Sequence, residues 1–154
     1  MDYKRFCDEA PVALYKTLQS DGTFIYINPY GAKLLGYDSP EDVVGKVKST
    51  SLYDPALRAR LIEELHATGK VSDFQVMITR PDGTTKWLSA TASNGDQVII
   101  GSLTDITERK DLQKKVEEQT AKELKRIALK AKARAESIAA ECQDNFCGQS
   151  LLLE

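Results

Sequence analysis

The stretch DGTFIYINPYGAKLLGY, residues 21–37, decides the fold because its residue pattern changes in the middle. Thr23–Ile27 is β-branched and aromatic, which favours a strand. Asn28 can cap a helix with its side-chain oxygen, and Pro29 suits the first helical position. Glycines at 22, 31 and 36 lack the G-x-G-x-x-G spacing of a phosphate-binding loop. The stretch therefore predicts a strand joined to a short helix that Gly36 ends.

Upstream of this unit, the sequence predicts a short helix and a strand. A helical lead covers Tyr3–Ala10 and stops at Pro11. Val12–Gln19 then favours a strand, and Ser20-Asp21-Gly22 forms the turn into the next one.

Downstream, two further helices are expected. Ser39-Pro40 opens the first, with Asp42 placed to complete a near-capping box. Asp54-Pro55 opens the second, which Gly69 ends. The second helix carries one apolar stripe, formed by Leu57, Leu61, Ile62 and Leu65.

Three strands follow these helices, over Asp73–Arg80, Thr85–Ser93 and Val98–Leu103. The turns between them, Pro81-Asp82-Gly83 and Asn94-Gly95-Asp96, are tight. Tight turns imply antiparallel pairing, so the sequence predicts an α+β fold with helices gathered on one face of a sheet.

From residue 105 onward the chain has no proline, and no glycine before Gly148. Its many Ala, Lys, Glu, Gln and Leu residues predict one long helix. Leu112, Val116 and Thr120 are spaced by four, and a heptad seam follows, typical of a coiled coil. The seam is rich in alanine and consists of Leu124, Ala128, Ala131, Ala135, Ile138 and Cys142.

Composition excludes several classes of function. The 154 residues carry a net charge of −2, which gives no general attraction to nucleic acid or anionic membrane. Six basic residues between 122 and 134 surround the helix and predict a solvated surface. No apolar run is long enough to span a membrane, and the N-terminus lacks a signal peptide pattern. Cys7, Cys142 and Cys147 suggest neither a disulfide framework nor a metal site, so we expect a cytoplasmic protein.

Three segments in the right order resemble the PAS domain, also called the sensory box. They are DGTFIYINPYGAKLLGY, RPDGTTKWLSA at 80–90, and GSLTDITERK at 101–110. The resemblance covers about residues 10–110 and implies a five-stranded antiparallel sheet whose helical flank encloses a small cavity. It also implies a C-terminal signalling helix, as in bacterial sensor histidine kinases of two-component systems and nucleotide cyclases.

The resulting domain assignment has four parts. Residues 1–10 form the helical lead, 11–104 the PAS domain and 105–152 the signalling helix. Leu153-Glu154 looks like a cloning scar.

By alternation and helical spacing, the predicted cavity wall consists of Leu35, Leu52, Leu57, Leu61, Phe74, Val76, Leu88, Ala90 and Gly101. A cavity open to a small organic ligand and a filled core both fit this set. No ionic group is obvious on the inward faces, although Arg58 and Arg60 can reach in. Residues 31–69 contain no cysteine for covalent flavin, and His66, the only histidine, sits at a helix end. We therefore expect neither haem nor covalent flavin, and no metal.

The resemblance assigns signal transmission to Asp105, Ile106, Thr107 and Arg109, with Asp105 paired to Arg109. Trp87 points to the face opposite Leu88, so it needs a cover. The N-terminal helix around Tyr3–Phe6 or a second subunit can supply it, with partial burial under the protein's own loops as the alternative. Dimer contacts are expected at Trp87, Leu112, Val116 and Leu124.

The sequence thus predicts a sensor and dimerisation module that forms a parallel homodimer and signals to an effector. We expect any catalytic activity to lie in a domain outside this chain. One alternative is an excised fragment of a sensor histidine kinase or nucleotide cyclase, and another is a stand-alone PAS protein that regulates a partner.

Overall fold

The structure, a computed structural model, describes residues 2–152, with side chains described as far as residue 143. The chain divides into two units, Met1–Lys110 and Asp111–Glu154. The expected cloning scar at Leu153-Glu154 lies outside the described residues, as does the side chain of Cys147.

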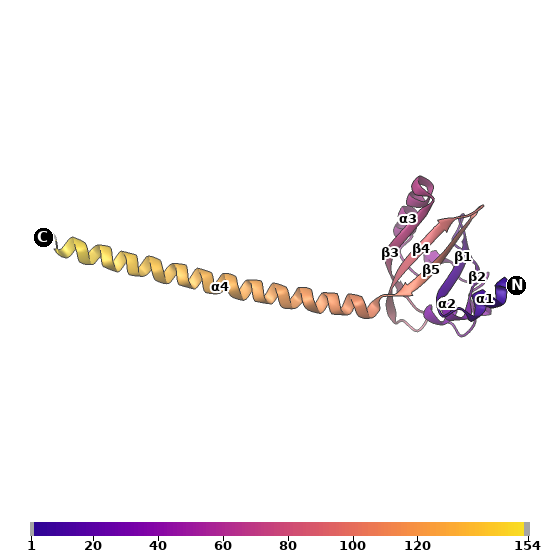
Figure 1. The fold of residues 1–154 in the computed structure, drawn as a ribbon, viewed down its shortest axis with the longest axis horizontal. Coiled ribbons are helices and arrows are strands. Elements are labelled where there is room, and N and C mark those ends of the chain that lie inside the picture. Colours follow the sequence, from indigo (N-terminus) through magenta and orange to yellow (C-terminus); the bar gives the residue numbers. More distant parts are fainter. Residues whose placement is uncertain (1, 153–154) are drawn as a thin grey trace. The chain divides into compact units, whose positions relative to one another are not determined.

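The elements follow the predicted order, and Figure 1 labels the α-helices and strands along the chain. They are α1 (Tyr3–Glu9), β1 (Ala13–Leu18), β2 (Phe24–Ile27), α2 (Pro29–Leu34), the 3₁₀ turns η1 (Pro40–Asp42) and η2 (Ser49–Ser51), α3 (Pro55–Thr68), β3 (Lys70–Thr79), β4 (Thr85–Asn94), β5 (Val98–Asp105) and α4 (Thr107–Leu152).

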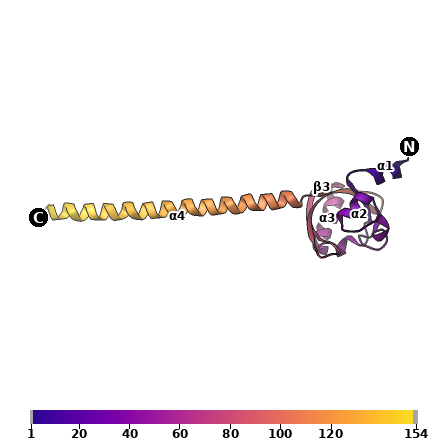
Figure 2. The ribbon, with the colours of Figure 1, turned by 90° about the horizontal axis from the view of Figure 1, so that it is seen from below.

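The five strands form one sheet in the order β2-β1-β5-β4-β3, and every neighbouring pair is antiparallel. Helix α2 packs on β1 and α3 on β3. Figure 2 shows both helices within the curve of the sheet, and the core lies between these two layers. The predicted α+β fold with a five-stranded antiparallel sheet is confirmed.

The predicted cap at Asn28 organises the N-terminal half. Its side-chain oxygen accepts from the N–H of Gly31 at 2.9 Å, which starts α2, and from the N–H of Leu14 at 3.0 Å. Its amide nitrogen donates to the carbonyls of Cys7 at 3.0 Å and Val12 at 2.7 Å. Asn28 is fully buried, and these four bonds satisfy its polar atoms while tying α1, β1 and α2 together.

Several boundaries differ from the prediction. Strand β3 begins at Lys70, three residues early, because a bulge between Val71 and Phe74 carries the pairing past Asp73, whose φ is +53°. Strand β5 continues to Asp105 rather than Leu103, because Asp105 still pairs with Leu88 on β4.

The helix predicted to open at Ser39-Pro40 is only the 3₁₀ turn η1. Its Ser39 forms no capping bond to the backbone, because the hydroxyl lies 3.3 Å from the carboxylate of Asp42 instead. The predicted near-capping box is therefore wrong.

Helix α4 matches the predicted long helix and starts at Thr107. Within residues 2–152, no helix is both long enough and apolar enough to cross a bilayer.

Candidate functional site

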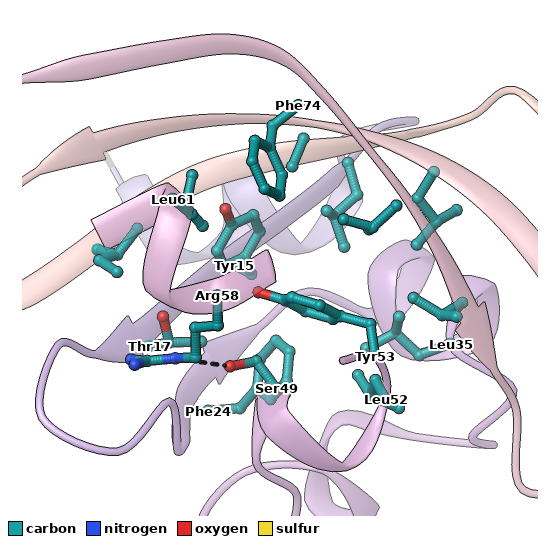
Figure 3. A pocket seen from close by; sticks show the side chains of 16 residues that line it. Tyr15, Thr17, Phe24, Leu35, Ser49, Leu52, Tyr53, Arg58, Leu61 and Phe74 are labelled. Atoms are coloured by element: carbon teal, nitrogen blue, oxygen red, sulfur yellow. Dashed lines mark hydrogen bonds between the residues drawn. The ribbon is translucent and has the colours of Figure 1, made fainter. Parts of the chain in front are cut away.

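A cavity of about 50 Å³ lies between the inner face of the sheet and the segment that runs from α2 to α3 (Figure 3). Its wall is almost wholly apolar. A few tenths of this volume suffices for one water molecule, whereas an engineered cavity of about 150 Å³ holds benzene. The cavity can thus accommodate only a very small molecule.

The structure brings most of the sequence-predicted wall together. The lining includes Leu35, Leu52, Leu61, Phe74, Val76, Leu88 and Ala90. Leu57 does not line it, because its side of α3 faces surface grooves beside β3. Gly101 does not line it either, since the ring of Tyr15 covers this glycine from the paired strand β1.

Two tyrosines of the wall were missed by the sequence reasoning. Tyr15 is 8% exposed, and its ring meets that of Phe24 edge-on, with centroids 6.2 Å apart. Tyr53 lies just before α3, and Figure 3 shows its hydroxyl directed toward Tyr15. Alternation with Ala13 and Thr17 along β1 could have placed Tyr15 inward, but no local pattern marks Tyr53.

Burial keeps both phenols neutral. It raises the pKa of Tyr15 far above its ordinary value, and the neighbouring Tyr53 raises it further. Burial also raises the pKa of Tyr53, although Ser49 and the guanidinium of Arg58 partly oppose this. Each phenol can therefore both donate and accept a hydrogen bond at neutral pH.

Arg58 reaches the cavity wall from α3, as the sequence allowed, whereas Arg60 does not line it. The guanidinium of Arg58 donates to Ser49 Oγ at 3.2 Å and to the carbonyls of Leu18 at 3.1 Å and Gln19 at 2.9 Å. These bonds direct the charge toward the turn after β1. Arg58 thus fastens α3 to the β1–β2 hairpin.

Neither His66 nor Cys7 lines the cavity. His66 is exposed in the last turn of α3, 2.9 Å from the side-chain nitrogen of Gln19. Cys7 lies on α1 and Cys142 on α4, and both are free thiols. The cavity lining contains no histidine and no cysteine.

A second cluster lies where β5 passes into α4, and we call Asp105–Thr107 the junction. Asp105 accepts from Lys86 Nζ at 2.7 Å and from the N–H and hydroxyl of Thr107 at 2.9 and 2.6 Å. The Trp87 N–H donates to the Thr107 hydroxyl at 3.0 Å, and the N–H of Ile106 donates to the Trp87 carbonyl at 2.9 Å. Ile106 is buried. The junction is thus fastened to β4.

Partial burial raises the pKa of Asp105, but the hydrogen bonds from Lys86 and Thr107 outweigh it and hold this pKa below its usual value. The carboxylate is therefore ionised at neutral pH and caps the first turn of α4.

The expected pairing of Asp105 with Arg109 is wrong. The cation on Asp105 is Lys86, because Asp105 pairs with Leu88 across the β4–β5 ladder and so lies beside Lys86. Arg109 instead approaches Asp73 at 4.0 Å, with both side chains 61% exposed. Asp73 in turn accepts from Ser89 Oγ at 2.7 Å.

Trp87 is half-buried, and Lys110 Nζ lies 4.8 Å from its ring centroid. The expected cover by the N-terminal helix is wrong. Helix α1 bonds at the far edge of the sheet, where Tyr26 donates to Asp8 at 3.0 Å, and Tyr3 and Phe6 remain exposed. Trp87 is instead partly buried under the protein's own chain, which is the alternative that the sequence left open.

The remaining predicted dimer residues lie along α4. Leu112, Val116 and Leu124 are 55%, 61% and 62% exposed. Their own chain therefore does not cover them.

Comparison with known proteins identifies the fold family. A sequence model of the PAS domain matches residues 11–108, well over half of the chain. No curated protein matches.

Three solved structures show the likeness. An RNA-binding light-oxygen-voltage receptor is 26% identical with a TM-score of 0.64, over 77% of this chain and 36% of that one. This chain thus spans only about a third of that receptor. A PAS domain from a two-component sensor histidine kinase is 16% identical, with a TM-score of 0.58, over 67% and 92% of the two chains. A sensory box histidine kinase/response regulator from Burkholderia thailandensis is 18% identical, with a TM-score of 0.56, over 82% and 99%.

The matched residues contain the whole sheet, the cavity wall and the junction. The chain therefore belongs to the PAS domain family, whose members are sensory modules.

Proposed function

We propose that this chain is a sensor module in which a small molecule in the cavity changes the junction and, through it, helix α4. The observation that carries the proposal is that strands β4 and β5 each contact both the cavity and the junction. On β4, Leu88 lines the cavity while the preceding Trp87 holds Thr107 and Ile106. On β5, Leu103 lines the cavity two residues before Asp105. A shift of either strand on ligand binding would reach the junction directly.

The output is proposed to be a change in a parallel homodimer formed by α4. The heptad seam from Leu124 to Cys142 supports this, because its side chains are exposed on the single chain. Half of the six seam residues are alanine, so the seam buries little area per turn and gives a weak interface. Weak pairing suits a signalling helix whose two packings differ by only a few kcal/mol. A second subunit would also cover the open side of Trp87.

A small organic ligand fits this proposal better than haem or a covalently bound flavin. The volume of about 50 Å³ and the absence of histidine and cysteine from the lining support that choice.

The effector is proposed to be a separate domain or partner protein, so that any catalytic activity lies outside this chain. A fragment of a bacterial sensor histidine kinase or nucleotide cyclase is the alternative. The free thiols of Cys7 and Cys142 support a reducing compartment such as the cytoplasm.

Sedimentation equilibrium of the full chain over a concentration series tests the dimer. We expect the wild type to dimerise and the double variant Leu124→Glu with Ile138→Glu to be monomeric, because two charges on each helix would face each other across the seam. Leu129→Glu is the matched control. It is 59% exposed but lies off the seam, so this variant should dimerise like the wild type. A monomeric wild type, or equal loss in the control, would show that α4 does not pair through this seam.

A further inference from the structure

The hydroxyl of Tyr15 is a polar group at the wall of the apolar cavity. The side chain is 8% exposed, and its surroundings are apolar side chains of the cavity wall. Among the described side chains, Arg80 Nε is the one fully enclosed polar atom without a hydrogen-bond partner. The Tyr15 hydroxyl has no protein partner among these residues either, so it borders the open space of the cavity. A hydroxyl that faces a small apolar cavity lacks the hydrogen bonds that it makes in water, and a hydrogen-bonding guest would restore them.

The position of this hydroxyl is set by β5. Tyr15 pairs with Gly101 across the β1–β5 ladder. A Cβ at Gly101 would lie 2.8 Å from the Tyr15 hydroxyl oxygen and would also collide with the carbonyl of Thr91. Only glycine therefore lets the ring lie flat over β5 with its hydroxyl at the cavity. Figure 3 shows this hydroxyl near Phe74 and Leu61, away from the guanidinium of Arg58.

The size of the cavity limits the guest. Its volume is about 50 Å³, roughly a third of that of an engineered cavity that binds benzene. One water molecule needs about 10–15 Å³ of such space, so a guest of about three to five non-hydrogen atoms matches the cavity.

The charges around the cavity favour a neutral guest. Arg58 supplies the only charged side chain of the lining, and three of its donor contacts already go to Ser49 Oγ and the carbonyls of Leu18 and Gln19. No acidic side chain lines the wall to pair with a cation. An ion among these apolar groups would lose its hydration without full compensation.

We propose that the cavity binds a neutral alcohol, ketone or aldehyde of two to four carbons, whose oxygen hydrogen-bonds to the Tyr15 hydroxyl while its carbons contact Phe74, Leu61 and Ala90. This names the ligand class for the sensor proposed above and rests on that proposal. Because the Tyr15 ring lies over Gly101 of β5, a guest bound to Tyr15 would act through this ring on the strand that leads to Asp105.

Methyl NMR of the full chain tests this inference with propan-2-ol as the polar probe and xenon as the apolar one. In the wild type both should shift the methyl signals of Leu61, Leu88 and Ala90, and the propan-2-ol shifts should saturate with a Kd on the order of millimolar, as expected for so few atoms. Tyr15→Phe keeps the ring but removes the hydroxyl. It should weaken propan-2-ol binding about three- to tenfold while leaving the xenon shifts in place.

The control is Tyr30→Phe, since Tyr30 is half-exposed on α2 and outside the cavity lining. It should bind both probes like the wild type. If Tyr15→Phe fails to fold, Ala90→Val provides the second variant, because the added methyl groups should fill the cavity and abolish both sets of shifts.

The outcomes separate the two proposals. Xenon entry without propan-2-ol binding, or equal propan-2-ol affinity in wild type and Tyr15→Phe, would overturn the ligand class alone. Saturable binding of acetate that is lost in Arg58→Gln would also overturn it, in favour of an anion. No shift with either probe would mean a filled core, and the cavity-based sensor function would then fail as well.

Discussion

The PAS core and helix α4 differ in how far their apolar side chains are exposed. In the core, Leu35, Leu65 and Leu88 are at most 1% exposed, and the buried amide of Asn28 is fully hydrogen-bonded. Along α4, Leu112, Leu124 and Leu129 are each more than half exposed. Apolar burial stabilises the core within one chain, whereas the same residue types on α4 gain burial only against a partner. The core can therefore hold a ligand while the pairing of the helix stays adjustable.

Matched leucine truncations should produce the largest contrast between the two regions. Leu65→Ala removes a fully buried side chain of α3 and should lower the free energy of unfolding of the core by about 2–5 kcal/mol. Leu129→Ala makes the same chemical change on α4, off the seam, and should cost less than about 0.5 kcal/mol.

Urea denaturation of the full chain, followed by the fluorescence of Trp87, measures both variants. Trp87 lies on β4, so its signal reports the core. Equal losses in the two variants would remove the distinction between a self-sufficient core and a dependent helix.

The second contrast concerns polar groups inside the core. Asn28→Ala removes the cap of α2, its bond to the carbonyl of Cys7, and the side-chain partner of the Val12 carbonyl and the Leu14 N–H. We expect a loss of about 2–4 kcal/mol in the free energy of unfolding.

Asn94→Ala serves as its control, because Asn94 is exposed and accepts one bond from Gln19 at 3.3 Å. That variant should lose less than about 1 kcal/mol. If urea denaturation shows the same loss in the free energy of unfolding for both substitutions, the bonds of Asn28 do not organise the N-terminal half.

The success of sequence reasoning depended on how local each feature is. The Asn28 cap, the Gly69 helix end and the alternation of Leu88 and Ala90 follow from neighbouring residues, and all three appear in the structure. The pairing of Asp105 with Lys86 joins residues 19 positions apart, so it requires the β4–β5 register. Tyr53 was missing from the predicted cavity wall for the same reason, because only the packing of α3 against the sheet brings it to the cavity.

The junction between the two regions should give the smallest effect, which a pH series can resolve. The pKa of Asp105 is lower in the folded chain than its ordinary value of 3.8, so its hydrogen bonds to Lys86 and Thr107 stabilise the fold above that pH. This contribution is lost as the pH falls through the folded pKa. Asp105→Asn should therefore be less stable than the wild type at pH 7, by about 1 kcal/mol or less because the pair is partly exposed, and the difference should shrink toward pH 3.

Free energies of unfolding measured between pH 7 and pH 3 check this expectation. Asp96→Asn is the matched control, since Asp96 is exposed in the β4–β5 turn and has no ion pair within the described side chains. It should follow the wild-type curve throughout. A gap between Asp105→Asn and the wild type that stays constant to the lowest pH would mean that the carboxylate charge does not act at the junction, and that shape alone holds β5 to α4.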